Sequence, residues 1–559
     1  MILGLLLGSL LQLIFPFLTQ TIVDTGIGGK ELGFVWMVLL AQMMLLFSRT
    51  AIDFIRSKIL LHISTRINIS LISDFFIKLM KLPMKFFDTK LMGDLLQRIE
   101  DHRRVEQFLT SSSLSLLFSF FTFLIFGIVL AVYNLYIFGV FLLGTILYAG
   151  WIVIFLKKRR QLDYKYFEQA GRNRNVTYQL INGMQEIKLQ GCEQRKRWEW
   201  EDVQADLFKV NLQSLNLQQI QQAGSITINE VKNILITVLA ATSVIQGNMT
   251  LGMMLAVQYI IGQLNSPVEQ LVRFIYSWQD VSISLDRMNE IHTETNEENA
   301  ERTRNNYTEE SIDGHSLAIK DLSFKYDIYS PKDILSNINL SIPNGKVTAI
   351  VGASGSGKTT LVKLLLGFYE PLNGRIEIGN TNLNEYNLAW WRNQCGAVMQ
   401  EGYLFSDTIA RNIAISDDEP DIERIRYAAR VANIADYIEA LPLAYNTMIG
   451  QDGQGISQGQ RQRILIARVV YKNPMFVFLD EATNALDANN ERAITESLSD
   501  FYKGKTVVVV AHRLSTVRNA DQIVVLDEGK IVEVGTHEEL TSKRGKYFAL
   551  VKNQLELGN

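Results

Sequence analysis

The sequence predicts an all-α membrane domain of six helices, followed by an α/β domain built on a parallel sheet. Two observations support this division. The first half holds apolar runs long enough to cross a bilayer, and four of them are clear, at residues 2–23, 32–48, 114–133 and 135–156. From Ser316 onward, short alternating or β-branched runs are separated by helical patterns, which is typical of an α/β fold.

Three of the predicted spans have alternative interpretations. The first run is also compatible with a signal peptide, but no basic segment precedes it and no small-residue cleavage site follows it, which favours a retained span. Runs five and six, at residues 234–245 and 251–264, are short, and Glu230 and Lys232 precede the first of them. Core helices of a soluble domain are the alternative for this pair. The four upstream spans favour two further spans that line a shared polar interior.

The segments between the spans predict their orientation. Residues 24–31, 133–135 and 246–250 are short, whereas residues 52–113 and 157–229 are long, charged and helical in pattern. The second long segment opens with four consecutive basic residues. The positive-inside rule therefore places both long segments in the cytoplasm, and six spans then place both termini there.

The two long segments predict membrane helices that continue far into the cytoplasm, because structureless loops of this length are uncommon. Each is expected to turn back through a short cross-helix, within residues 82–94 and 182–188. An exposed tip of this kind suits docking onto a cytoplasmic partner. A solvated coiled coil without a partner is the alternative.

Length, net charge and cysteine content exclude several kinds of function for this chain. At 559 residues the chain is too long for one ordinary domain, and its net charge of −3 gives no case for nucleic-acid binding. Cys192 and Cys395 are too few for a disulfide framework, and both lie in segments predicted to be cytoplasmic, so we expect them to be reduced. Neither has the Cys or His neighbours that a metal site would need.

A polar stretch separates the two halves. Residues 294–306 are nearly free of apolar side chains, which predicts a linker. Strands are expected beyond it, at residues 317–326, 334–342, 347–351, 476–479, 506–510 and 522–526. We therefore expect a transmembrane domain at 1–286, a linker at 287–315 and an α/β domain at 316–559.

The strand at 347–351 runs into a glycine-rich loop and then into an apolar helical pattern. Residues 352–359 read GASGSGKT, which fits G-x-x-x-x-G-K-[ST]. In such a loop, backbone N–H groups and the positive end of the following helix surround phosphate oxygens. Lys358 is placed to reach β- and γ-phosphates, and the Thr359 hydroxyl to hold Mg²⁺. A chance match in a glycine-rich turn is the alternative, which the flanking strand and helix disfavour.

Two carboxylates end the apolar strand at 476–479. Asp480 is placed to hold Mg²⁺ through water, and Glu481 to take a proton from an attacking water. Alone, this pair is an ordinary polar strand end. In the same domain as a P-loop, it indicates hydrolysis of a nucleoside triphosphate.

Four further candidate positions lie at the ends of predicted helices and strands. Ser457 and Gly459 stand where a helix begins, a natural anion site, although an N-capping serine followed by a flexible glycine is equally expected. Gln400 and His512 each follow a strand-like segment. A lone histidine there is usually structural, but this one ends a strand at the edge where α/β domains bind ligands.

In their order and spacing, these motifs resemble ABC exporters with fused membrane and nucleotide-binding domains, over nearly the whole chain. The fold expected from the resemblance is a membrane all-α six-helix exporter domain plus an α/β P-loop nucleotide-binding domain. Ser457-Gln458-Gly459-Gln460 matches the family signature, with Ile456 and Gln458 in place of the usual Leu and Gly. The resemblance implies that the ATP-binding residues are Tyr326 (stacked on adenine), Gly352, Ser354, Gly355, Ser356, Gly357, Lys358, Thr359, Thr360, Ser457, Gly459, Gln460 and Asp487 (in the D-loop). It implies that the Mg²⁺ ligands are Thr359, Gln400 and Asp480, and that the catalytic residues are Glu481, His512 (the switch histidine) and Gln400 (in the Q-loop).

The architecture of this family implies a homodimer, because one chain carries six spans and one cassette. ATP would lie between the P-loop of one cassette and Ser457 and Gly459 of the other. Closure of this pair would shift the cross-helices and turn the cavity outward, and hydrolysis would reset it. The implied cofactors are ATP and Mg²⁺, and the implied partners are a second copy, a peptide substrate and the lipid bilayer, with no nucleic acid.

The cargo is inferred from a narrower resemblance. Residues 182–191 and 400–407 resemble those of bacterial peptide or bacteriocin exporters, so ATP-driven efflux of a peptide across the bacterial inner membrane is expected. A lipid or drug exporter of the same fold is the first alternative. A membrane-anchored P-loop ATPase without transport is less favoured, because an anchor needs no long cytoplasmic helices. Many of these peptide exporters carry an N-terminal cysteine-peptidase domain. No Cys/His pair precedes the first span, so leader cleavage is not expected of this chain.

Overall fold

The computed structural model describes residues 2–90, 92–298, 316–450, 455–482, 488–511 and 517–557. The chain forms two compact units. The helical unit comprises Met1–Leu82 with Phe86–Glu294, and the sheet unit comprises Pro83–Lys85 with Thr295–Asn559.

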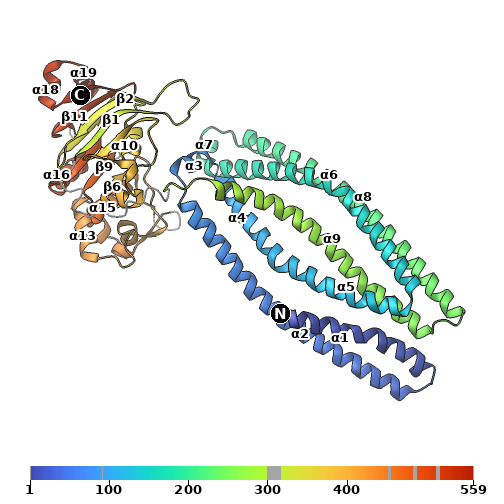
Figure 1. The fold of residues 1–559 in the computed structure, drawn as a ribbon. Coiled ribbons are helices and arrows are strands. Elements are labelled where there is room, and N and C mark those ends of the chain that lie inside the picture. The colour runs from blue at the N-terminus through green and yellow to red at the C-terminus, as the bar shows by residue number, and fades with distance from the viewer. Residues whose placement is uncertain are drawn as a thin grey trace. The chain divides into compact units, whose positions relative to one another are not determined.

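Long helices dominate the helical unit (Figure 1). In its described residues, six helices have 20 or more residues: α1 (Ile2–Thr21), α2 (Leu32–Met80), α5 (Ser113–Tyr133), α6 (Leu135–Asn182), α8 (Glu193–Ile245) and α9 (Leu251–Thr293). The shorter elements are the π-helices η1 (Ile22–Ile27) and η2 (Phe108–Ser112) and the α-helices α3 (Met84–Thr89), α4 (Met92–Gln107) and α7 (Met184–Leu189).

The expectation that membrane helices continue well beyond the bilayer is confirmed. Helices α2, α6 and α8 have 49, 48 and 53 residues. At about 1.5 Å per residue, each is roughly 70–80 Å long, more than twice the hydrocarbon thickness of about 30 Å. The short helices α3 and α7 lie where the sequence predicts cross-helices.

Among the residues that the structure describes, five helical segments are long and apolar enough to cross a membrane: Gly8–Ile27, Leu32–Met80, Gly93–Tyr133, Leu135–Asn182 and Glu193–Ile245. Helix α9, which contains the predicted sixth span, is not among them. Polar residues such as Gln258, Gln263 and Asn265 interrupt its apolar run. Its apolar side chains are instead buried against other helices, as the complete burial of Val257 and Ile260 shows.

The core of the helical unit joins α5, α6, α8 and α9. Phe126, Leu130, Phe141, Ile236 and Ile260 form its fully buried centre. The corner between α5 and α6 is a single residue, Asn134, whose side-chain oxygen accepts hydrogen bonds from the backbone N–H groups of Tyr136 (2.9 Å) and Ile137 (3.2 Å). This cap fixes the start of α6.

A six-stranded sheet forms the centre of the sheet unit, with strand order β12-β11-β3-β10-β9-β6. Its strands are β3 (Val347–Val351), β6 (Cys395–Val398), β9 (Phe476–Asp480), β10 (Thr506–Val510), β11 (Gln522–Asp527) and β12 (Lys530–Gly535). All neighbours pair in parallel except β11 and β12. Both faces are buried, so that Val477 and Leu479 face one core and Phe476 and Phe478 the other. This matches the predicted parallel sheet.

The first two predicted strands belong to a different sheet, which the sequence pattern did not distinguish. Strands β1 (Leu317–Phe324) and β2 (Leu335–Ile342) form an antiparallel sheet with β4 (Asn373–Ile378) and β5 (Thr381–Asn382), in the order β2-β1-β4-β5. The segment between β1 and β2 holds no helix that would carry the chain across to a parallel neighbour, so the two strands pair antiparallel. Strands β7 (Asp407–Thr408) and β8 (Met448–Ile449) form a separate pair.

Helices cover these sheets. They are α10 (Lys358–Leu365), α11 (Leu388–Gln394), α12 (Ile409–Ile413), α13 (Ile422–Val431), α14 (Ala435–Glu439), α15 (Gln458–Lys472), α16 (Ala488–Phe501), α18 (His537–Lys543) and α19 (Lys546–Leu557), with 3₁₀ turns at Leu383–Glu385 and Ala444–Asn446.

Candidate active site

The strand register brings the predicted motifs to one edge of the parallel sheet. Val510 at the end of β10 pairs with Ile350 on one side and Asp480 on the other, and Val398 at the end of β6 pairs with Leu479. The chain leaves these parallel strands at the same edge, which is where α/β sheets bind ligands. The P-loop, the two acidic residues and Gln400 therefore share this edge.

The P-loop backbone leaves a cradle that suits phosphate. Gly357 has a φ of 101°, and a Cβ there would come within 2.7 Å of the Leu335 side chain, so this position needs glycine for both conformation and space. Gly355 also has a positive φ, 78°, but a Cβ there would meet nothing within 4 Å. The loop is thus tight beneath Gly357 and open at Gly355.

Lys358, the first residue of α10, lies inside this loop. Its ammonium group donates hydrogen bonds to the carbonyl oxygens of Gly352 (3.0 Å) and Ala353 (2.9 Å), and the residue is only 6% exposed. Burial lowers the pKa of Lys358, and the nearby charges of Glu481 and Asp480 act in the opposite direction. The predicted phosphate-binding cation and the two predicted carboxylates are therefore electrostatic neighbours.

The two carboxylates occupy different environments. Asp480 is fully buried at the end of β9. Glu481, one residue on, is partly exposed and has a φ of 54°, which is unusual for a residue with a side chain. The Glu481 backbone N–H donates to the Val510 carbonyl oxygen (3.2 Å), and the Gln462 side chain donates to the Glu481 carbonyl oxygen (3.4 Å). These bonds hold a strained backbone, and such strain clusters at functional sites.

The donor chemistry at this edge fits Mg²⁺ better than a protein-caged metal. Within the described residues, no group of three or more His, Cys, Asp or Glu side chains is placed to hold a metal ion. The oxygens available are those of Asp480, the Thr359 hydroxyl and the Gln400 amide, all hard donors. Mg²⁺ is commonly held by one or two protein oxygens together with substrate phosphates.

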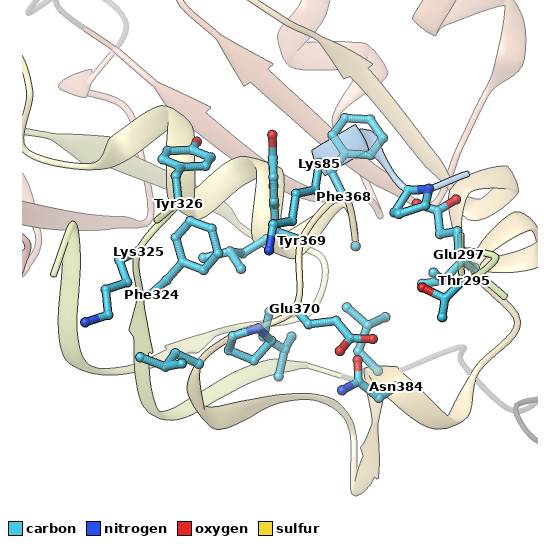
Figure 2. Close-up of a pocket in the computed structure, with 18 of the residues that line it drawn as sticks. Lys85, Thr295, Glu297, Phe324, Lys325, Tyr326, Phe368, Tyr369, Glu370 and Asn384 are labelled. Carbon is cyan, nitrogen blue, oxygen red and sulfur yellow. The ribbon is translucent and has the colours of Figure 1, made fainter. Parts of the chain in front are cut away.

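Aromatic residues line a cavity of about 500 Å³ in the sheet unit. Tyr326 packs edge-on against Phe324 (5.0 Å between ring centroids) and Tyr369 (5.1 Å), as Figure 2 shows. The Tyr326 hydroxyl lies 3.3 Å from the Thr360 hydroxyl in α10, and the Tyr326 ring is 39% exposed. Tyr326 is thus an accessible aromatic face beside the P-loop helix. Tyr369 was not predicted, because its sequence signal is no more than the aromatic pair Phe368-Tyr369 after α10.

Ser457 is the N-cap residue of α15 and is exposed to solvent. Its hydroxyl accepts from the Gln460 backbone N–H (3.2 Å), and the Gln460 side chain accepts from the Ser457 backbone N–H (2.8 Å). Gln460 is therefore engaged in capping its own helix. In the described part of the chain, no hydrogen bond joins Ser457 or Gly459 to the P-loop. Gln400 is exposed at the sheet edge. His512 and Asp487 lie outside the described residues.

Both halves of the chain match known protein families. Residues 1–268 match the ABC transporter transmembrane region, and residues 335–484 match the ABC transporter family. The chain is 33% identical over 536 residues to the alpha-hemolysin translocation ATP-binding protein HlyB of Escherichia coli, covering 96% of this chain and 75% of that protein. It is 34% identical over 554 residues to the toxin RTX-III translocation ATP-binding protein of Actinobacillus pleuropneumoniae, covering 98% and 76%.

A solved structure shares the fold. A bacterial Atm1-family ABC exporter with ATP bound superposes with a TM-score of 0.90 at 27% identity, over 99% of this chain and 97% of that one. These similarities confirm the predicted fold class, ATP binding and transport-coupled ATP hydrolysis, and they decide against a P-loop ATPase without transport. The chain belongs to the ABC transporter family, as a multi-pass membrane exporter whose transmembrane and ATP-binding domains are fused.

Proposed function

We propose that two copies of this chain form a homodimer that uses ATP hydrolysis to move a peptide outward across the bacterial inner membrane. The observation that supports a peptide cargo is the similarity to translocation proteins named for toxins, which extends over 96–98% of the chain. The run of basic residues after the fourth span supports an orientation with the long helices and both termini in the cytoplasm.

In this proposal each residue of the sheet edge has one role. Lys358 neutralises β- and γ-phosphate oxygens, and the N–H groups of the open loop around Gly355 bind the same phosphates. Asp480, Thr359 and Gln400 hold Mg²⁺, which when bound balances phosphate charge. Glu481 accepts a proton from the attacking water. The strained backbone of Glu481 aims its carboxylate while Asp480, one residue before it, stays buried in the strand.

The remaining predicted ATP contacts come from a second chain. Ser457 and Gly459 stand at the exposed start of α15, without a hydrogen bond to the P-loop of their own chain in its described part. A helix start with exposed polar groups suits the γ-phosphate side of a nucleotide held by a partner. Tyr326 provides the aromatic face for adenine. His512 and Asp487 keep the roles of switch histidine and D-loop aspartate in this proposal.

Transport into inside-out vesicles tests the cargo class. The full chain is embedded in vesicles and supplied with Mg²⁺-ATP and one of three probes: an unstructured 20-residue peptide, a fluorescent phosphatidylethanolamine or a hydrophobic cationic dye. ATP-dependent accumulation of the peptide is expected, and none for the Glu481→Gln variant. Accumulation of only the lipid or the dye would overturn the peptide assignment while leaving the exporter intact.

A lipid or drug exporter is the second candidate. The observation that favours it is the solved Atm1-family neighbour, which superposes over 97% of its length and is not named as a toxin translocator. The same fold thus occurs in an exporter outside the toxin-translocation group. The lipid and dye arms of the vesicle experiment decide between the two candidates.

A further inference from the structure

A cavity of about 480 Å³ that is open to solvent lies between α6, α8 and α9 of the helical unit. Its volume falls in the roughly 300–1,000 Å³ range of ligand sites. Most of its lining residues lie within residues 157–229, the long segment that the sequence places in the cytoplasm. None of the residues assigned to the ATP site lies in this cavity.

On α8, uncharged polar side chains line the cavity in a continuous strip, and Leu217 and Ile226 lie at its two sides. The strip consists of Ser214, Gln218, Gln221, Gln222, Ser225 and Asn229. Their spacing, i, i+4, i+7, i+8, i+11 and i+15, places all six within about 100° of the helix circumference. At about 1.5 Å per residue, the strip is roughly 22 Å long.

The side chains of the strip are available to a ligand. In the described part of the chain, none of the six makes a side-chain hydrogen bond with another residue. Each amide offers two N–H donors and one carbonyl acceptor, and each hydroxyl offers one donor and two lone pairs. The strip thus presents donors and acceptors in similar numbers and carries no charge.

The helix that bears the strip is anchored to its neighbour. The indole N–H of Trp151 in α6 donates to the Gln221 carbonyl oxygen at 3.0 Å, and Gly224 lies so close to the same indole that a Cβ would overlap it. These contacts anchor the backbone of α8 against α6, so the strip is positioned without hydrogen bonds from its own side chains.

Charged groups of both signs complete the cavity. Arg159, Asp163, Glu269 and Arg273 line it, which makes two groups of each sign. Arg159 stacks over the Tyr276 ring at 3.9 Å and pairs with Asp163 (3.7 Å) and with Asp280 (3.9 Å). Arg159 and Asp163 also line a second cavity of about 370 Å³, so this charged group stands where the two cavities meet.

We propose that the polar strip on α8 binds the backbone of an extended, unfolded polypeptide through its amide and hydroxyl groups, independently of the cargo's sequence. An unfolded chain presents an N–H donor and a C=O acceptor at nearly every residue, which matches the strip. The balanced charges tolerate cargo side chains of either sign. A strip of about 22 Å corresponds to six or seven residues at about 3.3–3.6 Å each.

A lipid fits this wall poorly, because acyl chains would strand six uncharged polar groups without partners. The proposal rests on the proposed peptide export and adds how the cargo is held. It predicts that the exporter recognises the main chain of the cargo and that side chains contribute little.

Backbone-modified peptides test this directly on the unaltered protein. The full chain in phosphatidylethanolamine–phosphatidylglycerol nanodiscs is titrated with a fluorescein-labelled 20-residue peptide of Gly, Ser, Asp and Lys. A scrambled peptide is expected to bind within about twofold of the parent. The same peptide with alternate backbone nitrogens methylated is expected to lose at least tenfold in affinity. Affinity should rise with peptide length and level off near seven residues.

Matched substitutions localise the effect. Replacing Gln218, Gln221 and Gln222 together with leucine should weaken binding of the parent peptide at least tenfold, whereas replacing them with asparagine should restore most of the affinity. Gln219→Leu, on the same helix but outside the cavity lining, is the control and should leave both peptide binding and basal ATP hydrolysis within twofold.

Each failure has its own meaning. If peptides bind and are transported but methylation and the leucine substitutions have no greater effect than Gln219→Leu, the polar strip is not the binding surface and peptide export stands. If no peptide binds and only the lipid or dye is transported, the proposed cargo class and the strip proposal both fall.

Discussion

The Lys358 ammonium group donates a hydrogen bond to the Gly352 carbonyl oxygen at 3.0 Å, which joins the two ends of the P-loop. The same group donates to Ala353 at 2.9 Å. One buried cation therefore holds the loop in its curved shape, and the shape leaves the space beside Gly355 open. A residue proposed to bind phosphate also organises the loop that binds it.

The pH dependence of nucleotide binding should report on Lys358. Burial lowers its pKa from the ordinary value of 10.5. The ammonium form attracts phosphate and the neutral amine does not, so ATP affinity should fall as pH rises. Because the pKa of Lys358 is lowered, the midpoint of this fall should lie below pH 10.5. Binding of a fluorescent ATP analogue to the full chain between pH 7 and 10 measures this. Lys358→Met should bind at least tenfold more weakly at pH 7 and lack this decline; an identical decline in the variant would exclude Lys358 as its source.

Glu481→Gln should preserve ATP binding and reduce turnover about 10²–10⁴-fold, because an amide keeps the size of the side chain but cannot accept the proton. Glu528→Gln is the matched control. Glu528 also follows a strand and also has a positive φ, 45° against 54° for Glu481, but it is exposed and has no assigned role. Phosphate release by the full chain should change less than twofold in the control. Near-normal turnover in Glu481→Gln would remove Glu481 from the role of base.

Glu297 fastens the start of the interdomain segment to the sheet unit. Its carboxylate accepts two hydrogen bonds from Arg392 in α11, at 2.8 and 2.6 Å, and both side chains are mostly buried. Arg392 also donates to the carbonyl oxygens of Leu366 (3.2 Å) and Gly367 (2.8 Å). Helix α11 leads directly into β6 and Gln400, so this pair links the segment after α9 to the strand that ends at the candidate site.

The two substitutions that break the Glu297–Arg392 pair should lower the stability of the chain by different amounts. Glu297→Gln should cost about 1–3 kcal/mol, because it leaves a partly buried guanidinium short of its charged partner. Arg392→Gln should cost more, since it also removes two bonds to carbonyl oxygens. Thermal unfolding of the full chain, with proteolysis after Glu294 as a second readout, checks the order. Glu423→Gln, in an exposed pair with Arg426, should cost no more than about 1 kcal/mol. Equal effects of all three substitutions would contradict a role for the Glu297–Arg392 pair.

Local chemistry made much of the candidate site predictable from the sequence. The strand–loop–helix order around Gly352–Lys358 depends on a short apolar run and on glycine conformations, and both signals lie within about fifteen residues of sequence. The pairing of β1 with β4 was not predictable in this way, because alternation shows that a strand is half-buried without naming its partner. Tyr369 was not predictable for a similar reason, because its role depends on the contact with Tyr326 that forms only in the folded chain.

In the helical unit, too, some features were predictable from the sequence and others were not. The long helices and the cross-helices at α3 and α7 follow from hydropathy and helical periodicity. The polar strip on α8 is also visible as a periodicity, but the sequence does not say which face of α8 meets a cavity, because that depends on the packing of α6 and α9. The positive φ of Glu481 has no sequence signal, since glutamate rarely adopts it.

The two cysteines should differ in reactivity although both are free thiols. Cys395 is 4% exposed at the start of β6, and burial raises its pKa well above the ordinary value, so almost no thiolate is present at neutral pH. Cys192 lies partly exposed between α7 and α8. Maleimide at pH 7 should label Cys192 alone in the native chain and both residues in denaturant, as counted by mass spectrometry. Cys192→Ser is the control that isolates Cys395. Rapid labelling of Cys395 in that native variant would show that the core around β6 opens to solvent, and the burial that separates the two thiols would then not hold.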